Sequence, residues 1–244
     1  MFSYFILGVI QGIFEWIPVS SEGAVALISQ FLNGAMGGWR PVDLALFLHF
    51  GTLLAVLVYF RKDWKEVIIL KNKKLLKFLI TATIFSLVIG YPVYKLVRNA
   101  AVGNTLLIIM GLGLLLTAYF QKRKKKLEIS SDKLATLTGF FQGLAVIPGL
   151  SRSGATIFSL SLGKSDPAEI LKLSYMMSAP AILASSGYLF LENPILASQA
   201  WPALIFSFLV GFISLHFLIT LAHKINFFKF ALIFGLLCLL GAVI

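Results

Sequence analysis

Residues 148–156 combine one arginine, three hydroxyl side chains and two glycines within a segment that is otherwise strongly apolar. An arginine in hydrocarbon is costly, so it is kept where it faces a cavity and a partner. Glycines let the backbone approach a ligand, hydroxyls donate hydrogen bonds, and a guanidinium engages two phosphate oxygens at once. This combination favours a phosphate site over a soluble-facing loop with an incidental arginine. The residues expected to bind the phosphate are Ser151, Arg152, Ser153, Gly154 and Thr156.

A second polar group lies in the first apolar segment, where Gln11 and Glu15 are four residues apart. This spacing places both side chains on one face of a helix. A carboxylate at membrane depth is a functional candidate by default. Opposite a phosphate-binding arginine, Glu15 could hold a divalent metal, serve as a base, or only pair with Arg152.

Ser20, Ser21 and Glu22 follow Pro18 and interrupt the same apolar segment. One of the two hydroxyls could be a nucleophile or a phosphate ligand, while a helix-capping serine is the equally favoured alternative. His49 lies within a later apolar run; it could line the cavity, and a packed, hydrogen-bonded histidine is the equally favoured alternative. The sequence contains no His, Cys and Asp cluster of metal-ligand spacing and no nucleotide-binding motif.

The composition indicates what positions these residues. The chain has 244 residues, of which 59% are hydrophobic and only 13% are charged. A soluble domain would carry about 25% charged residues, so the chain is predicted to be an all-α polytopic membrane protein. The net charge of +11 does not indicate nucleic-acid binding, because the basic residues lie in short loops between apolar runs.

Six apolar runs are long enough to be transmembrane helices, and two further segments are broken. Residues 1–32 and 134–162 each contain two short apolar halves around a polar break. Broken backbone at membrane depth is tolerated only where protein or a water-filled cavity covers it. We therefore expect two re-entrant helix-loop-helix segments. The six predicted spans are 44–60, 78–94, 102–120, 173–191, 201–222 and 230–244.

The basic residues predict the orientation of these spans. Loops 61–77, 121–133, 164–172 and 223–229 hold 17 of the 21 Lys and Arg residues, as expected for cytoplasmic loops. The alternation of sides closes only if each broken segment enters and leaves on the same side of the membrane. The first would dip in from outside and the second from the cytoplasm.

The two broken segments also resemble each other. Adding 131 to a residue number places Gln11 on Gln142, Gly12 on Gly143, Ser20 on Ser151, Gly23 on Gly154 and Ala24 on Ala155. Each broken segment is followed by three spans, so the halves must have opposite orientations. We predict one membrane domain over 1–244, built from an inverted repeat of residues 1–120 and 132–244.

Residues 11–23 resemble the first signature of the undecaprenyl-diphosphate phosphatase family of the bacitracin-resistance type. Residues 148–156 resemble its second signature, and residues 48–57 are similar to the segment that follows the first. The resemblance covers essentially the whole chain. It implies an integral membrane enzyme that removes the terminal phosphate of a C55 polyprenyl diphosphate and so recycles the lipid carrier for cell-wall glycans.

The resemblance also assigns roles by position. Gln11 and Glu15 match the (E/Q)xxxE element, Ser21 matches the hydroxyl after the loop, and 151–156 match the phosphate-binding run. It implies catalytic roles for Glu15, Ser21 and Arg152, a divalent cation (Mg²⁺ or Ca²⁺) near Glu15, and a plasma-membrane site that opens to the outer face. The remaining expected substrate-binding residues are Gln11, Ser20, His49, Ser151, Ser153, Gly154 and Thr156.

This chain departs from the family pattern at two positions. Ala24 stands where many members have a histidine, and Glu22 stands where a threonine or a similar residue is usual. A mechanism that uses that histidine as the base is therefore in doubt, and Glu15 and Glu22 are the available bases. Either Ser21 attacks the phosphorus, which we favour slightly, or a metal-activated water attacks while Ser21 holds an oxygen.

Two functions remain at this stage. The first is a phosphatase, in which positioning and electrostatics carry the phosphoryl transfer. The second is a polyprenyl-phosphate flippase or transporter, because inverted repeats with broken helices are a transporter architecture. The family resemblance favours the phosphatase. The expected partners are the polyprenyl diphosphate substrate, membrane lipids and, in a homodimer, a second copy of the chain.

Overall fold

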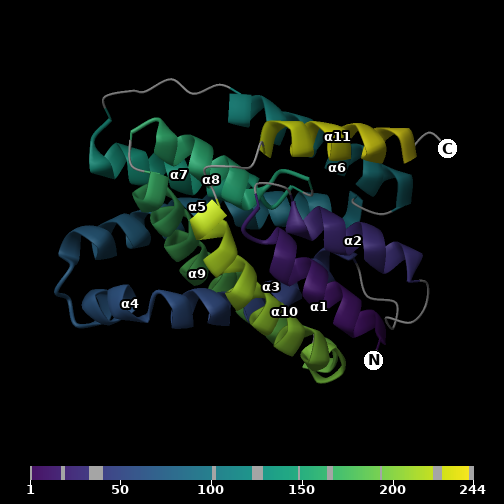
Figure 1. Cartoon of the computed structure of the whole chain (residues 1–244), viewed down its shortest axis with the longest axis horizontal. Helices are drawn as coiled ribbons and strands as arrows, with labels where there is room; N and C mark the ends of the chain where they lie inside the picture. Colours follow the sequence, from purple (N-terminus) through teal and green to yellow (C-terminus); the bar gives the residue numbers. More distant parts are fainter. Residues whose placement is uncertain are drawn as a thin grey trace.

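The protein is built from helices (Figure 1). The structure is a computed structural model that describes residues 2–17, 20–32, 41–100, 103–122, 129–147, 149–163, 167–192, 194–221 and 227–241. Every regular element in these ranges is an α-helix, which confirms the predicted all-α class. Pro18, Arg40, Lys124 and Pro148 lie outside the described residues.

Six long helices coincide with the six predicted spans. Within the described residues, two of them, over Lys73–Val97 and Ser198–Ile219, are long and apolar enough to cross a membrane. A third span results if the bent pair Asp43–Tyr59 and Arg61–Ile68 is counted as one segment. The remaining spans stay predictions. The six helices are α3 (Pro41–Tyr59), α5 (Lys73–Ala100), α6 (Gly103–Lys122), α9 (Pro167–Glu192), α10 (Pro194–Leu221) and α11 (Phe227–Gly241).

The basic segment 61–77 is not simply a loop, contrary to the prediction. It begins with the helix α4 (Arg61–Ile68), which bends by 81° from α3. Val67 is buried and Trp64 packs against the main core. The burial of these two apolar side chains stabilises a helix in this otherwise polar segment. Asp63 pairs with Lys172 of α9, which ties the short helix to the bundle.

Both broken segments have the predicted helix, break and helix. The first consists of α1 (Phe2–Phe14) and α2 (Ser21–Phe31), and the second of α7 (Ser131–Leu144) and α8 (Arg152–Ser161). These helices have 10 to 14 residues, which is too short to cross a bilayer alone. The breaks are confirmed, and their re-entrant topology stays a prediction.

The two breaks use the same capping geometry. Gly23 N–H donates to Ser20 Oγ at 3.0 Å, and Gly154 N–H donates to Ser151 Oγ at 3.1 Å. These serines and glycines correspond under the shift of 131 residues, so the sequence match is also a structural match. Gly149 precedes the second cap with a φ of 91°, a left-handed conformation that glycine adopts readily.

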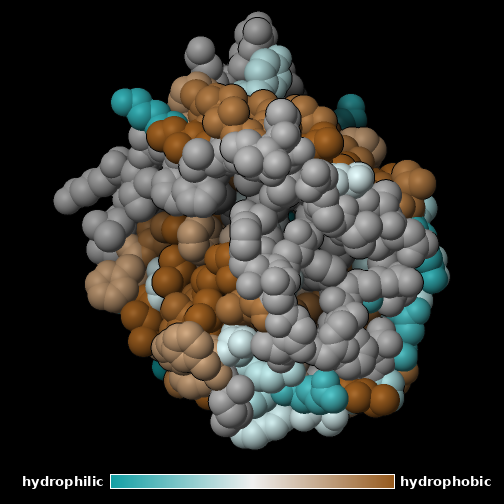
Figure 2. All heavy atoms as spheres, turned by 90° about the vertical axis from the view of Figure 1, so that its right-hand side faces the viewer, coloured by the Kyte–Doolittle hydropathy of each residue, from teal (hydrophilic) through white to brown (hydrophobic). Residues whose placement is uncertain are grey.

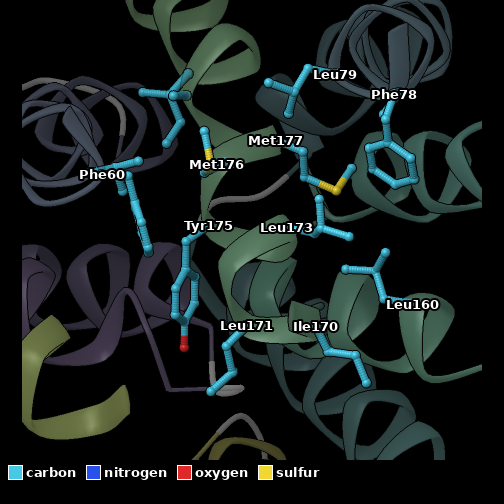
Figure 3. Packing of buried hydrophobic residues seen from close by; sticks show 14 of the residues in the cluster. Phe60, Phe78, Leu79, Leu160, Ile170, Leu171, Leu173, Tyr175, Met176 and Met177 are labelled. Carbon is cyan, nitrogen blue, oxygen red and sulfur yellow. The ribbon is translucent and has the colours of Figure 1, made fainter. Parts of the chain in front are cut away.

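The core lies where α3, α5, α8 and α9 meet. Figure 3 shows Met177 directed toward Phe78 and Leu79, with Met176 and Tyr175 on the same helix. Tyr175 Oη donates to the carbonyl of Trp16 at 3.1 Å, and its ring packs edge-on against the indole at 5.2 Å. Residues of the first break are thereby fixed to the middle of α9.

Close backbone packing fixes α1 against α10. A Cβ atom on Gly8 would lie 2.4 Å from the carbonyl oxygen of Ala203, and one on Gly12 would lie 2.7 Å from the amide nitrogen of Gly211. Small residues at such contacts let membrane helices approach closely. Trp16 Nε1 donates to the Gly211 carbonyl at 2.8 Å and fixes the end of the same pair.

The surface carries many exposed apolar side chains. Figure 2 shows extensive hydrophobic surface on the face it presents, with hydrophilic residues mainly toward its edges. Leu96, Leu191 and Phe217 are each more than half exposed. Water-exposed surfaces rarely carry so much contiguous apolar area, so this surface is suited to lipid.

Candidate active site

The carboxylate of Glu15 is the centre of the site. It lies just after α1 and is only 3% exposed. Its Oε1 pairs with Nη2 of Arg152, the first residue of α8. Its Oε2 accepts from Gln11 Nε2 at 2.6 Å and from Ser21 Oγ at 3.0 Å, and it lies 3.1 Å from His49 Nε2. Residues from α1, α2, α3 and α8 therefore meet on one carboxylate.

The ion pair between Arg152 and Glu15 joins the two breaks, and two hydrogen bonds accompany it. Gly149 N–H donates to Ser20 Oγ at 3.0 Å, and Ser153 Oγ donates to the carbonyl of Ile17 at 2.9 Å. The two sequence motifs, more than 130 residues apart, thus form one polar cluster. The sequence predicted that Glu15 lies opposite Arg152.

Ser20 and Ser21, which the family resemblance assigned to substrate binding and to catalysis, make different contacts. Ser20 Oγ caps α2 and accepts the Gly149 N–H, so it organises the backbone. Ser21 Oγ instead donates to the Glu15 carboxylate. A hydroxyl that donates to a buried carboxylate has the geometry of a nucleophile with its base.

Arg152 is placed to bind an anion. Its side chain is 13% exposed and lines both cavities described below. Besides Glu15, its guanidinium donates to the carbonyl of Ser174 at 3.5 Å. A guanidinium has five N–H donors, and within the described residues only these two contacts engage it.

The predicted phosphate-binding run is only partly directed at a cavity. Ser151 and Ser153 line the smaller cavity, with their hydroxyls 3.1 Å apart. Gly154 and Thr156 are not among the residues that line either cavity. Thr156 Oγ1 donates to the Arg152 carbonyl at 2.9 Å and lies 2.6 Å from Ser174 Oγ. Its visible contacts therefore hold α8 against α9.

His49, which was expected to bind substrate, lines both cavities and also contacts the Glu15 carboxylate. Its Nδ1 lies 2.8 Å from the carbonyl of Ala45, one turn earlier on α3. Its Nε2 lies 3.1 Å from Glu15 Oε2 and 4.0 Å from Glu22 Oε1. Many members of the family that the motifs resemble have a histidine at position 24, where this chain has Ala24; here the imidazole that reaches Glu15 comes from His49 on α3.

Two cavities meet at this cluster. The smaller lies between the breaks and is lined by Glu15, Ser21, Glu22, Arg152 and their neighbours. The larger is mostly apolar and extends between α5, α7 and α9. Glu22, His49 and Arg152 line both cavities, so a ligand that spans them would pass these three side chains.

Three buried oxygen atoms at or near the cluster lack a hydrogen-bond partner within the described part of the chain. They are Gln11 Oε1, Glu22 Oε2 and Gln142 Oε1. Buried polar atoms in native proteins nearly always have a partner, which can be water, an ion or a ligand. Gln11 was expected to bind substrate, whereas nothing in the sequence singled out Gln142 beyond its match to Gln11 in the repeat.

The fold and the site define a helical membrane protein with a buried, anion-binding hydrolytic centre. Residues 4–242 match the family described as bacitracin resistance protein BacA. The chain belongs to this family and is an integral membrane protein.

Relatives that carry the name undecaprenyl-diphosphatase support this assignment. The one from Haloarcula marismortui is 34% identical, with 98% of this chain and 96% of the relative aligned. The one from Methanothrix thermoacetophila is also 34% identical, over 96% and 94% of the two chains. That from Methanopyrus kandleri is 34% identical over 96% and 93%. The family resemblance inferred from the two motifs is thereby confirmed.

Proposed function

We propose that this chain hydrolyses undecaprenyl diphosphate to undecaprenyl phosphate and inorganic phosphate, which recycles the lipid carrier. The observation that carries the proposal is the arrangement around Glu15. Ser21 Oγ donates to one carboxylate oxygen at 3.0 Å, and Arg152 pairs with the other. A nucleophile, a base and an anion-binding cation are thus within one polar cluster, as phosphoryl transfer to a hydroxyl requires.

The proposed reaction has two steps. The guanidinium of Arg152 binds oxygens of the terminal phosphate, and Ser21 Oγ attacks its phosphorus while Glu15 accepts the hydroxyl proton. The bond between phosphorus and the bridging oxygen breaks, and undecaprenyl phosphate leaves. Glu15 gives its proton to the departing phosphate oxygen. Water then attacks the phosphoserine while Glu15 takes a proton from the water and passes it to Ser21 Oγ as the bond between phosphorus and the serine oxygen breaks, which releases inorganic phosphate and restores the hydroxyl. The competing route, direct attack by water while Ser21 holds an oxygen, differs in lacking the phosphoserine.

The larger cavity suits the proximal part of the prenyl chain. Its wall carries Leu87, Ala181, Ile182 and Leu189, and it adjoins the polar cluster at Glu22, His49 and Arg152. Ligand pockets typically combine such an apolar wall with a few polar groups that fix orientation. The diphosphate would therefore lie at the polar end while the chain extends between α5 and α9 toward lipid.

A divalent cation, Mg²⁺ or Ca²⁺, completes the proposal because it neutralises phosphate charge when bound. The available donors fit such an ion in kind, since both prefer carboxylate and carbonyl oxygens. The described residues contain no group of three or more His, Cys, Asp or Glu able to hold a metal alone. Mg²⁺ commonly uses one or two carboxylates together with substrate phosphates, so a sparse set is sufficient. Glu15 as a ligand stays a prediction.

The proposed topology has six spans, two re-entrant segments and an inverted repeat in the plasma membrane, with the site facing outward. The matched caps at Ser20 and Ser151 and the loop charges support it. The homodimer stays a prediction.

A detergent assay tests the function. Purified protein in micelles, with no membrane to cross, should release phosphate from undecaprenyl diphosphate. Folded protein that releases none, yet moves the lipid between leaflets in vesicles, would support the flippase alternative instead.

A further inference from the structure

The side chain of Glu22 is largely buried, and the ion-pair contact that it makes, with His49, is long. Glu22 lies in the first turn of α2, its side chain is 12% exposed, and it lines both cavities. Its Oε1 is 4.0 Å from His49 Nε2, beyond hydrogen-bond distance, and its Oε2 has no partner among the described residues. We infer that Glu22 is the principal protein ligand of a divalent cation that binds together with the substrate diphosphate. This inference rests on the proposed phosphatase function.

The carboxylate of Glu15 is less suited to this task. Its two oxygens already contact four side chains, namely Arg152, Gln11, Ser21 and His49. A metal at Glu15 would have to displace at least one of these contacts. Glu22 lines both cavities and its Oε2 has no partner among the described residues, so binding a cation there would break no hydrogen bond of Ser21 or Glu15.

The charges at the site favour a cation at Glu22. Arg152, the first residue of α8, pairs directly with Glu15 and neutralises its charge. From α3, His49 approaches Glu22 only to 4.0 Å. A carboxylate oxygen that is removed from water without a hydrogen bond or an ion is costly. A bound cation removes that cost and also offsets the charge of the incoming diphosphate.

Gln142 provides a second, independent oxygen in the same cavity. Its Nε2 donates to Ser86 Oγ and to the Met177 carbonyl, both at 3.2 Å, and these bonds fix which end of the amide is which. Its Oε1 is left without a partner on a side chain that is 4% exposed and lines the larger cavity, as Glu22 does. Amide carbonyl oxygens are ordinary Ca²⁺ ligands. Gln142 is therefore the candidate accessory ligand.

Manganese binding tests the inference without reference to turnover. Detergent-purified protein is titrated with Mn²⁺ in the presence of methylene diphosphonate, a non-hydrolysable diphosphate, and free Mn²⁺ is measured by electron paramagnetic resonance. Glu22→Gln should weaken binding by about tenfold or more, whereas Glu22→Asp should retain part of it. Glu66→Gln on α4 removes the same charge outside both cavities and should leave binding unchanged.

The outcomes separate the inference from the function. If Glu22→Gln bound Mn²⁺ with wild-type affinity while Glu15→Gln lost binding, Glu15 would be the metal ligand and the inference would be overturned. Absence of Mn²⁺ binding by wild-type protein would overturn it as well. Phosphate release from undecaprenyl diphosphate, measured on the same wild-type preparation, decides the function separately. Near-native thermal stability of Glu22→Gln shows that a loss of binding is not a loss of fold.

Discussion

Ser20 and Gly149 are joined across the two breaks, because the hydroxyl that caps α2 also accepts the backbone N–H of Gly149 at 3.0 Å. One oxygen thus fixes the start of a helix and the position of the second motif. The contact helps to hold the second motif, which carries Arg152, against the first, which carries Glu15.

Ser20→Ala should lower both stability and activity. The loss of a cap and of a buried bond between the breaks should destabilise the protein by about 1–3 kcal/mol. Thermal unfolding in detergent measures the first effect and phosphate release the second. Ser198→Ala, which removes an exposed hydroxyl bonded only to the Ile195 carbonyl in the same helix, serves as the control. Unchanged stability in Ser20→Ala would show that the tie between the breaks is dispensable.

Arg152→Lys should be poorly tolerated. An ammonium cannot engage Glu15 and two phosphate oxygens with the planar geometry of a guanidinium. The expected cost is about 2–4 kcal/mol, or roughly 30- to 1,000-fold in kcat/KM. Arg61→Lys, an exposed exchange on α4, should have no effect. Activity of Arg152→Lys within threefold of wild type would contradict a bidentate role.

Ser21→Ala distinguishes the two reaction routes. If Ser21 is the nucleophile, the variant should fall below about one hundredth of wild-type activity, because no other hydroxyl donates to Glu15 in the described residues. Rapid quenching with labelled substrate, followed by mass spectrometry, should reveal phosphate on Ser21. A residual activity of one tenth or more would exclude the covalent route and leave water as the attacking group.

His49→Gln should reduce kcat more than it raises KM. The imidazole contacts the base rather than the predicted phosphate ligands, so its loss should disturb proton transfer by roughly 10²-fold. Ala24→His alone should give at most a modest gain, since an imidazole already reaches Glu15. Ala24→His added to His49→Gln should recover part of the lost activity. A fall in substrate affinity alone would assign His49 to binding.

Accessibility of single cysteines tests the topology. In a Cys238→Ala background, cysteines at positions 71 and 124 should react only from the cytoplasmic side, and cysteines at 40 and 98 only from outside. The expectation follows from the unequal distribution of basic residues between loops. Labelling of positions 98 and 124 from the same side would contradict the inverted repeat.

Hydropathy and helix-breaking residues were sufficient to locate the six long helices and the two breaks. They did not reveal α4, whose lysines mask the burial of Val67. At the site, the pairing of Glu15 with Arg152 was among the sequence-based alternatives. The contacts of His49 with Glu15 and Glu22 were not, because contacts between separate helices depend on helix rotation, which a linear pattern does not record. The contact of His216 Nδ1 with Tyr59 Oη, 3.4 Å apart on α10 and α3, is of the same kind.

Arg152 and Glu15, which form the ion pair, are far apart in the sequence. Glu15 and Ser21 are synthesised more than a hundred residues before Arg152. Under the proposed function, a nascent chain holds the base and the nucleophile but lacks the anchor for the diphosphate until Arg152 has been synthesised and has paired with Glu15. A chain truncated before Arg152 should therefore release no phosphate from the lipid around it.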